Sequence, residues 1–183
     1  PSANRSGELS PVKAQHVFKS LQGRVAWILD GGKCTKGLES TILDLCDKPK
    51  LLRAGNWDIH HLSQIIGPIE CGRDLEPDQR PKAPGMAYRH YAPKCSIRFG
   101  FENPGLNEGL LAFGPCEPPG FRVVKNLSPK GNLEEAAIHL FAYLHELEEA
   151  QVSRISVMPI PEQGAGIAIL ERLRKAVESC EHS

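Results

Sequence analysis

The stretch NLEEAAIHLFAYLHELEEAQ, residues 132–151, decides the fold class, because its apolar residues recur at the spacing of a helix with one buried face. That face comprises Leu133, Ala136, Ala137, Leu140, Phe141 and Leu144. Short apolar runs surround it, namely SIRFG (96–100), GLLAFG (109–114), FRVVKNL (121–127) and RISVMPIP (154–161), and GIAILERLRKAVE (166–178) reads as a closing helix. This alternation predicts a small α/β domain with a largely parallel sheet over residues 96–183.

The block at residues 1–67 predicts further α/β structure. Its strand candidates are RVAWILDGG (24–32), STILDLCD (40–47) and PKLLRAG (49–55). One predicted helix begins with Ser10 as its cap and Pro11 at its first position, and WDIHHLSQIIG (57–67) predicts a second that ends at Gly67. So few elements leave a sheet with little to cover it, and we expect this block to be the distal part of a larger domain whose N-terminal portion is absent.

Residues 68–95 predict a linker, because prolines are frequent there and no hydrophobic period runs through them. The segment APGMAYRHYAP (83–93) nevertheless places tyrosines beside cationic side chains. An ordinary tether is built from small, polar and charged residues. We therefore expect this segment to lie against another surface of the protein.

Composition limits the functions open to the chain. Its 183 residues include 22 Lys and Arg against 22 Asp and Glu, so no overall basic field exists to attract nucleic acid or an acidic membrane. No apolar run is long enough for a membrane helix. The six cysteines form no CxxC pair, which favours reduced thiols in the cytoplasm over a zinc site or a disulfide framework, and no metal site is predicted.

Three short polar residues near the start could contact a nucleotide. Ser2 and Asn4 stand on alternate positions before Gly7, in a loop that could hydrogen-bond phosphate or ribose but could equally be an ordinary turn. Ser10 could act at a helix N-terminus, where phosphate binds readily, or only as a cap.

Two further candidate residues, Ser40 and Arg53, lie at the ends of predicted strands. In KGLESTILD (36–44), Ser40 lies with Glu39 and Thr41 at a strand end, where a carboxylate or amino-acid ligand or a plain polar surface is equally consistent. Arg53 leaves a strand with its guanidinium expected to be free for a phosphate or for a surface ion pair. The GxG in QGAGIAIL is a weak dinucleotide signal and is interpreted as helix packing. No catalytic triad is recognised.

Taken together, the order of the motifs resembles the long, two-domain form of the YrdC-like threonylcarbamoyl-AMP synthase family. The motifs are PSANRSGELSP, DGGKCTKGLESTILDL, LLRAGNWDIHHLSQIIG, APGMAYRHYAPKC and PIPEQGAGIAILERLRKA, which span nearly the whole chain. The resemblance implies a twisted YrdC-like α/β catalytic domain represented by residues 1–67, a linker at 68–95 and a small Rossmann-like domain at 96–183.

The resemblance also implies an activity and a set of site residues. The expected reaction joins L-threonine, bicarbonate and ATP into threonylcarbamoyl-AMP and pyrophosphate, for a downstream tRNA-modifying transferase complex, with Mg²⁺ accompanying ATP. It implies that Ser2, Asn4, Ser10, Arg53 and Tyr91 contact ATP and that Ser40 contacts threonine. The alternatives are an RNA-binding YrdC-like module with weak RNA contact, and a non-catalytic regulatory fragment.

Overall fold

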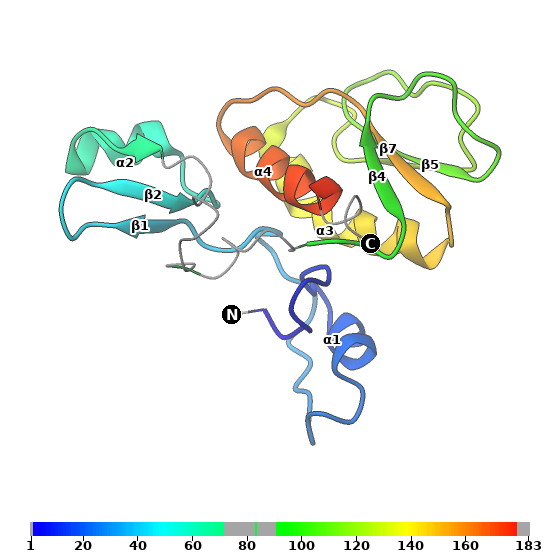
Figure 1. Cartoon of the computed structure of the whole chain (residues 1–183), viewed down its shortest axis with the longest axis horizontal. Helices are drawn as coiled ribbons and strands as arrows, with labels where there is room; N and C mark the ends of the chain where they lie inside the picture. Colours follow the sequence, from blue (N-terminus) through cyan, green and yellow to red (C-terminus); the bar gives the residue numbers. More distant parts are fainter. Residues whose placement is uncertain (1, 72–82, 84–90, 179–183) are drawn as a thin grey trace.

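The computed structural model describes residues 2–71, 83 and 91–178, and it is a mixed α/β structure with two sheets. The first sheet contains β1 (Ile42–Asp44), β2 (Lys50–Arg53) and β3 (Glu70–Cys71), with β1 antiparallel and β3 parallel to β2. Helix α2 (Ile59–Ile66) connects β2 to β3 (Figure 1). The two strands and the helix predicted between residues 40 and 67 are confirmed, whereas β3 lies within the predicted linker.

The second sheet is fully parallel, with the order β4-β7-β5-β6. Its strands are β4 (Ser96–Phe99), β5 (Glu108–Ala112), β6 (Val123–Asn126) and β7 (Arg154–Val157). Helix α3 (Leu133–Glu149) crosses from β6 to β7, and α4 (Ala165–Glu178) follows β7 (Figure 1). The four strands and two helices predicted for this region are confirmed, and so is the parallel sheet.

Helix α3 forms where predicted because its N-cap residue and its apolar face both favour a helix over these residues. The Asn132 side chain accepts a hydrogen bond of 2.8 Å from the Glu135 backbone N–H, which satisfies one of the unpaired donors of the first turn. The six residues of the predicted face include five that are buried, and they pack on α4 and on β5 and β6. The same hydrophobic core includes Leu9, Val12 and Leu51, so both ends of the chain share it.

The first helix, α1 (Ala14–Leu21), begins later than predicted. Lys13 is its N-cap residue and gives no side-chain cap, and the Ser10 hydroxyl donates to the Glu39 carboxylate instead of to the helix. The predicted cap and first-turn proline are therefore wrong. A carboxylate acceptor forms a charge-assisted hydrogen bond, which is stronger than a neutral cap contact.

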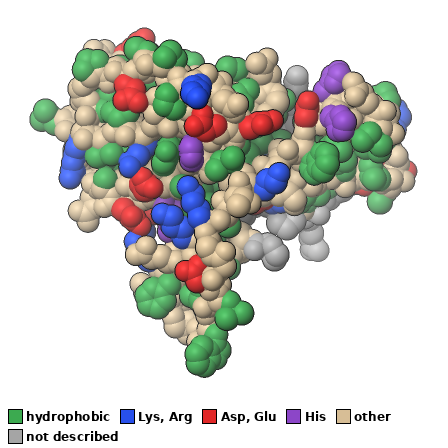
Figure 2. All heavy atoms as spheres, turned by 180° about the vertical axis from the view of Figure 1, so that it is seen from behind, with side chains coloured by type: hydrophobic (Ala, Val, Ile, Leu, Met, Phe, Trp, Pro, Cys, Tyr) green, Lys and Arg blue, Asp and Glu red, His purple; other side chains and the backbone are tan. Residues whose placement is uncertain are grey.

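The predicted strand at residues 24–32 is also wrong, since no strand is assigned there. Trp27 and Leu29 are 89% and 96% exposed, and the neighbouring Val25 and Phe18 are exposed as well. Figure 2 shows apolar side chains gathered at the tip of the part that projects downward, the part that contains α1 in Figure 1. A strand needs a neighbour for its backbone N–H and C=O groups, and no described strand pairs with this segment.

No helix in the described ranges is both long enough and apolar enough to cross a membrane. The segment at 83–93, which we expect to lie across another surface of the protein as a strap, is mostly outside the described residues, which include only Ala83 and Tyr91–Pro93 of it.

Candidate functional site

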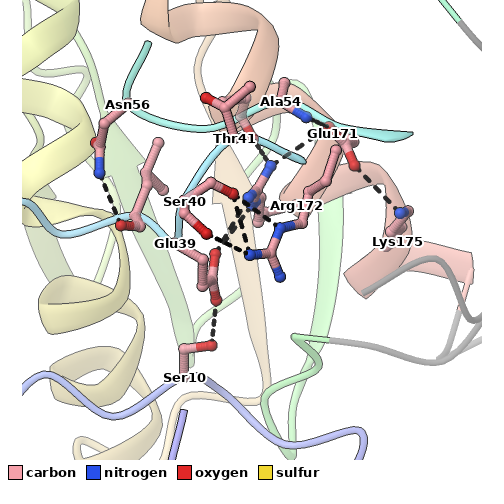
Figure 3. Close-up of polar contacts among 12 residues, drawn as sticks. Ser10, Glu39, Ser40, Thr41, Ala54, Asn56, Glu171, Arg172 and Lys175 are labelled. Atoms are coloured by element: carbon pink, nitrogen blue, oxygen red, sulfur yellow. Dashed lines mark hydrogen bonds and ion pairs between the residues drawn. The ribbon is translucent and has the colours of Figure 1, made fainter. Parts of the chain in front are cut away.

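Glu39 joins two distant parts of the chain at the candidate site. Its Oε1 accepts a 2.5 Å hydrogen bond from the Ser10 hydroxyl, and its Oε2 lies 3.1 Å from Nη2 and 3.3 Å from Nε of Arg172 (Figure 3). Arg172 belongs to α4 and is fully buried, while Glu39 precedes β1. The ion pair therefore fixes the C-terminal helix to the segment that carries Ser40.

Arg53 and Ser40, which sequence analysis assigned to different substrates, are in direct contact. The Arg53 guanidinium donates to the Ser40 carbonyl from Nε at 3.1 Å and from Nη2 at 3.0 Å, and Nη2 also lies 3.3 Å from the Ser40 hydroxyl oxygen. Arg53 is only 8% exposed, so the expectation of a free guanidinium at the end of β2 is wrong. Ser40 itself is exposed. The arginine thus holds in place a hydroxyl that solvent or a ligand can reach.

Tyr91 is buried against the same group of residues. Its ring centroid lies 5.5 Å from that of Phe141 on α3, and the Arg172 guanidinium carbon lies 5.5 Å from the centre of the Tyr91 ring. Burial raises the pKa of the Tyr91 hydroxyl, while the nearby charge of Arg172 and a hydrogen bond with Arg53 oppose that rise. The structure therefore brings Ser10, Ser40, Arg53 and Tyr91 together through Glu39 and Arg172.

The first loop, residues 2–8, contains the two other residues that the sequence assigns to ATP, Ser2 and Asn4. Asn4 donates from Nδ2 to the carbonyls of Arg5 and Glu8, each at 3.0 Å, and Ser2 is exposed. The Gly7 carbonyl accepts a 2.9 Å hydrogen bond from the backbone N–H of Ala92, the residue after Tyr91. The loop is thus tied to the end of the predicted strap, while the interactions described for Ser2 and Asn4 do not connect them to Glu39 or Arg53.

Sequence analysis missed Arg172 as part of this site. A signal for it was present, because Arg172 shares the apolar face of α4 with Ala168, Ile169 and Ala176. Arginine is almost never fully buried unless it is paired, so a lone arginine on such a face indicates a buried acidic partner. The partner, Glu39, was recognised only as a polar strand end.

A further polar contact holds Ser10 from the other side. Nε2 of His145 on α3 lies 3.1 Å from the Ser10 carbonyl, and the His145 ring stacks on His16 of α1 with centroids 3.7 Å apart. The two rings line a cavity of about 560 Å³ between α1 and α3. Ser10 is therefore buried, with its hydroxyl and its carbonyl both engaged.

The described residues offer no ligand set for a magnesium ion. No group of three or more His, Cys, Asp or Glu side chains in the described ranges could hold a metal. Near the site, the Glu39 carboxylate is already shared by Ser10 and Arg172. Mg²⁺ prefers oxygen ligands and is commonly bound by one or two carboxylates together with substrate phosphates.

Comparison with protein families gives two matches that divide the chain near β2. Residues 58–177 match the family described as "Threonylcarbamoyl-AMP synthase, C-terminal domain", and residues 1–55 match the family described as "Telomere recombination".

Among curated proteins, the chain is similar to threonylcarbamoyl-AMP synthases of three organisms. It is 36% identical to that of Bacillus subtilis over 96% of this chain and 56% of the relative. It is 32% identical to those of Pyrococcus abyssi and Schizosaccharomyces pombe, again over 96% of this chain and over 56% and 51% of the relatives. The chain thus spans about half the length of the curated relatives that it matches.

Among solved structures, the fold is similar to that of P. abyssi Sua5 complexed with L-threonine. The TM-score is 0.82 at 32% identity, over 98% of this chain and 57% of the other. A double alanine variant of the same protein matches with a TM-score of 0.81 at 31% identity, over 98% of this chain and 56% of that chain.

Proposed function

Because this chain belongs to the family described by the threonylcarbamoyl-AMP synthase C-terminal domain, we propose that it corresponds to the C-terminal half of such a synthase. In this proposal the complete protein makes threonylcarbamoyl-AMP and pyrophosphate from L-threonine, bicarbonate and ATP. The observation that carries the proposal is the direct contact of Arg53 with Ser40, which supports a shared site for the residue that we assign to ATP and the residue that we assign to threonine.

The proposed chemistry asks for positioning more than for acid or base groups. The threonine amine and bicarbonate give a carbamate and water, and a carbamate oxygen attacks the α-phosphorus of ATP while the bond to pyrophosphate breaks. Holding the reactants together and neutralising developing charge can supply most of the acceleration of such a transfer. MgATP enters as substrate, and no step is assigned to a protein-bound metal.

The residues take the following roles in the proposal. Ser40 is exposed and accepts from Arg53, so its own O–H is available to donate to the threonine carboxylate. Arg53 holds Ser40 in place and also binds ATP. Tyr91 contributes to the ATP site through its hydroxyl, which hydrogen-bonds with Arg53.

The first loop completes the proposed ATP site. Ser2 and Asn4 would contact the nucleotide in the complete protein, and Ser10 would contribute from its place beside Glu39. The hydrogen bond from Ala92 to Gly7 supports this grouping, because it ties the loop to the residue next to Tyr91.

We propose the finer architecture on the same basis. Residues 1–67 are the distal part of a twisted YrdC-like catalytic domain, 68–95 the linker, whose start adds β3 to the first sheet, and 96–183 a small Rossmann-like domain. The all-parallel order β4-β7-β5-β6 with crossover helix α3 supports the last assignment. We place the protein in the cytoplasm, where its product would feed a tRNA-modifying transferase complex.

Pyrophosphate release by the full-length protein tests the proposed activity. Release should require threonine, bicarbonate and ATP together, and omission of any one should reduce it to background. Release that is independent of threonine would show a different nucleotide reaction. The salt dependence of tRNA affinity tests the RNA-binding alternative, which predicts a steep decrease as salt rises.

A further inference from the structure

We propose that Glu171 and Arg172, adjacent residues of α4, are positioning residues for the threonine site. The inference rests on the proposed function and deepens it. In this inference α4 holds two chain segments, one that precedes β1 and one that follows β2. Ser40 and Arg53 are thereby kept in contact.

Arg172 holds the first segment through Glu39. Its guanidinium is fully buried and lies 3.1 Å from the Glu39 carboxylate, whose residue directly precedes Ser40. A buried charge without a partner is strongly unfavourable, so the position of Glu39 is tied to that of α4. The Arg172 guanidinium also contacts Glu171 at 3.3 Å and the Ala168 carbonyl at 3.4 Å, which fix it to its own helix.

Glu171 holds the second segment. Its Oε2 accepts a 3.1 Å hydrogen bond from the backbone N–H of Ala54, the residue that directly follows Arg53. Lys175, one turn further along α4, lies 3.2 Å from the Glu171 Oε1 and keeps the carboxylate in place. The two neighbouring side chains of α4 therefore hold the residue before Ser40 and the residue after Arg53 (Figure 3).

The two segments are also hydrogen-bonded to each other. The Leu38 carbonyl accepts from the Asn56 side chain at 2.9 Å (Figure 3), and the Thr41 hydroxyl accepts from the Trp57 backbone N–H at 3.2 Å. Both donors lie just after β2, so the two segments are also joined to each other. Because the two segments are connected in this way, a displacement at α4 should move both of them, and Ser40 with them.

Two variants and a matched control test this in the full-length protein. Arg172→Gln removes the guanidinium that holds Glu39, and Glu171→Ala removes the carboxylate that accepts from the Ala54 backbone N–H. Arg174→Gln is the control, since Arg174 lies on the same helix and pairs with Glu162 on an exposed face. We expect the first two to weaken threonine binding, measured by calorimetry without ATP, by about tenfold or more, and the control to leave it unchanged.

A double variant separates positioning from general loss of folding. Arg172→Gln with Glu39→Gln replaces the ion pair by two amides that can hydrogen-bond each other, so threonine affinity should recover partly relative to Arg172→Gln alone. Equal threonine affinity of wild type, Arg172→Gln and Glu171→Ala would overturn the proposal. So would a loss in Arg172→Gln that the double variant does not relieve.

A measurement on the present chain keeps the inference separate from the proposed activity. Hydrogen exchange of the Ala54 amide, resolved by NMR, should accelerate by at least about tenfold in Glu171→Ala and not in Arg174→Gln. If the full-length protein binds no threonine, the proposed function fails, while accelerated exchange still supports the positioning contact. Unchanged exchange at Ala54 would overturn the positioning role whatever the activity.

Discussion

Nη2 of Arg53 lies 3.0 Å from the Ser40 carbonyl oxygen and 3.3 Å from the Ser40 hydroxyl oxygen. The two residues come from opposite sides of the β1–β2 hairpin, and each was assigned to a different substrate. Their contact couples the two roles that we propose, so a change at one residue should also affect the other.

Arg53→Ala should therefore weaken threonine binding as well as ATP binding. Loss of hydrogen bonds from a charged group costs about 1.5–3 kcal/mol, and here the lost partner is the backbone that carries Ser40. Separate titrations of the full-length protein with each substrate measure this, with Lys50→Ala, exposed on the same strand, as the control. A change confined to ATP would leave Arg53 with a phosphate role alone.

Gly55→Ala should disturb the backbone around Ser40 by steric overlap. A Cβ at Gly55 would lie 2.2 Å from the Thr41 backbone nitrogen and 2.5 Å from the Ser40 carbonyl carbon. Overpacking of this kind costs roughly 1–3 kcal/mol in the free energy of unfolding. Denaturant titration provides the measurement.

Gly31→Ala is the matched control, because a Cβ there would meet no atom within 4 Å. It should leave the free energy of unfolding nearly unchanged. If both alanine variants were equally stable, the close approach of Gly55 to Ser40 would be contradicted.

Tyr91 should show a large contribution from its ring and a smaller one from its hydroxyl. Tyr91→Phe removes a hydrogen bond with Arg53 and should cost about 1 kcal/mol, whereas Tyr91→Ala should cost about 3–5 kcal/mol because the ring is buried on Phe141. Urea unfolding of the two variants compares them. Equal losses would mean that the ring packing does not dominate.

The stacked histidines predict a loss of stability in mild acid. The pKa of His16 lies at about 4, below its ordinary 6.5, first because the ring is buried and then because His145 lies against it. Lys13 and Lys19 lower that pKa further, while Glu149 opposes them. Burial also lowers the pKa of His145.

Unfolded chains take up a proton on His16 below about pH 6.5, and the folded protein does so only near pH 4. The free energy of unfolding should therefore decrease as the pH falls from 6.5 to 4. His16→Gln has no ring to protonate and should flatten this dependence, whereas His60→Gln on the exposed side of α2 should not. An identical pH profile for His16→Gln and wild type would refute the role of the pair.

Much of the fold could be predicted because local signals and packing agree. The region from residue 96 onward has apolar strands, a helix capped by Asn132 and an apolar face on that helix. Each of these features predicts the same parallel sheet covered by helices. The segment at 24–32 has the same strand composition and forms no strand, since composition supplies apolar side chains but not a neighbouring strand.

The candidate site was less predictable, because its contacts join residues far apart in the sequence. Ser40, Arg53 and Tyr91 were named individually, but the contacts of Arg172 with Glu39, the residue before Ser40, and with the Tyr91 ring depend on how α4 packs. A free guanidinium at Arg53 was wrong for the same reason: the acceptor lies on the neighbouring strand segment, at Ser40.

Labelled bicarbonate tests the proposed carbamate chemistry most directly. Full-length protein is incubated with ATP, threonine and ¹³C-bicarbonate, and the nucleotide products are separated and analysed by mass spectrometry. We predict threonylcarbamoyl-AMP that carries the isotope in its carbamoyl carbon, in proportion to the pyrophosphate released. Pyrophosphate accompanied by unlabelled AMP or by threonyl-AMP, with no labelled product, would contradict the account.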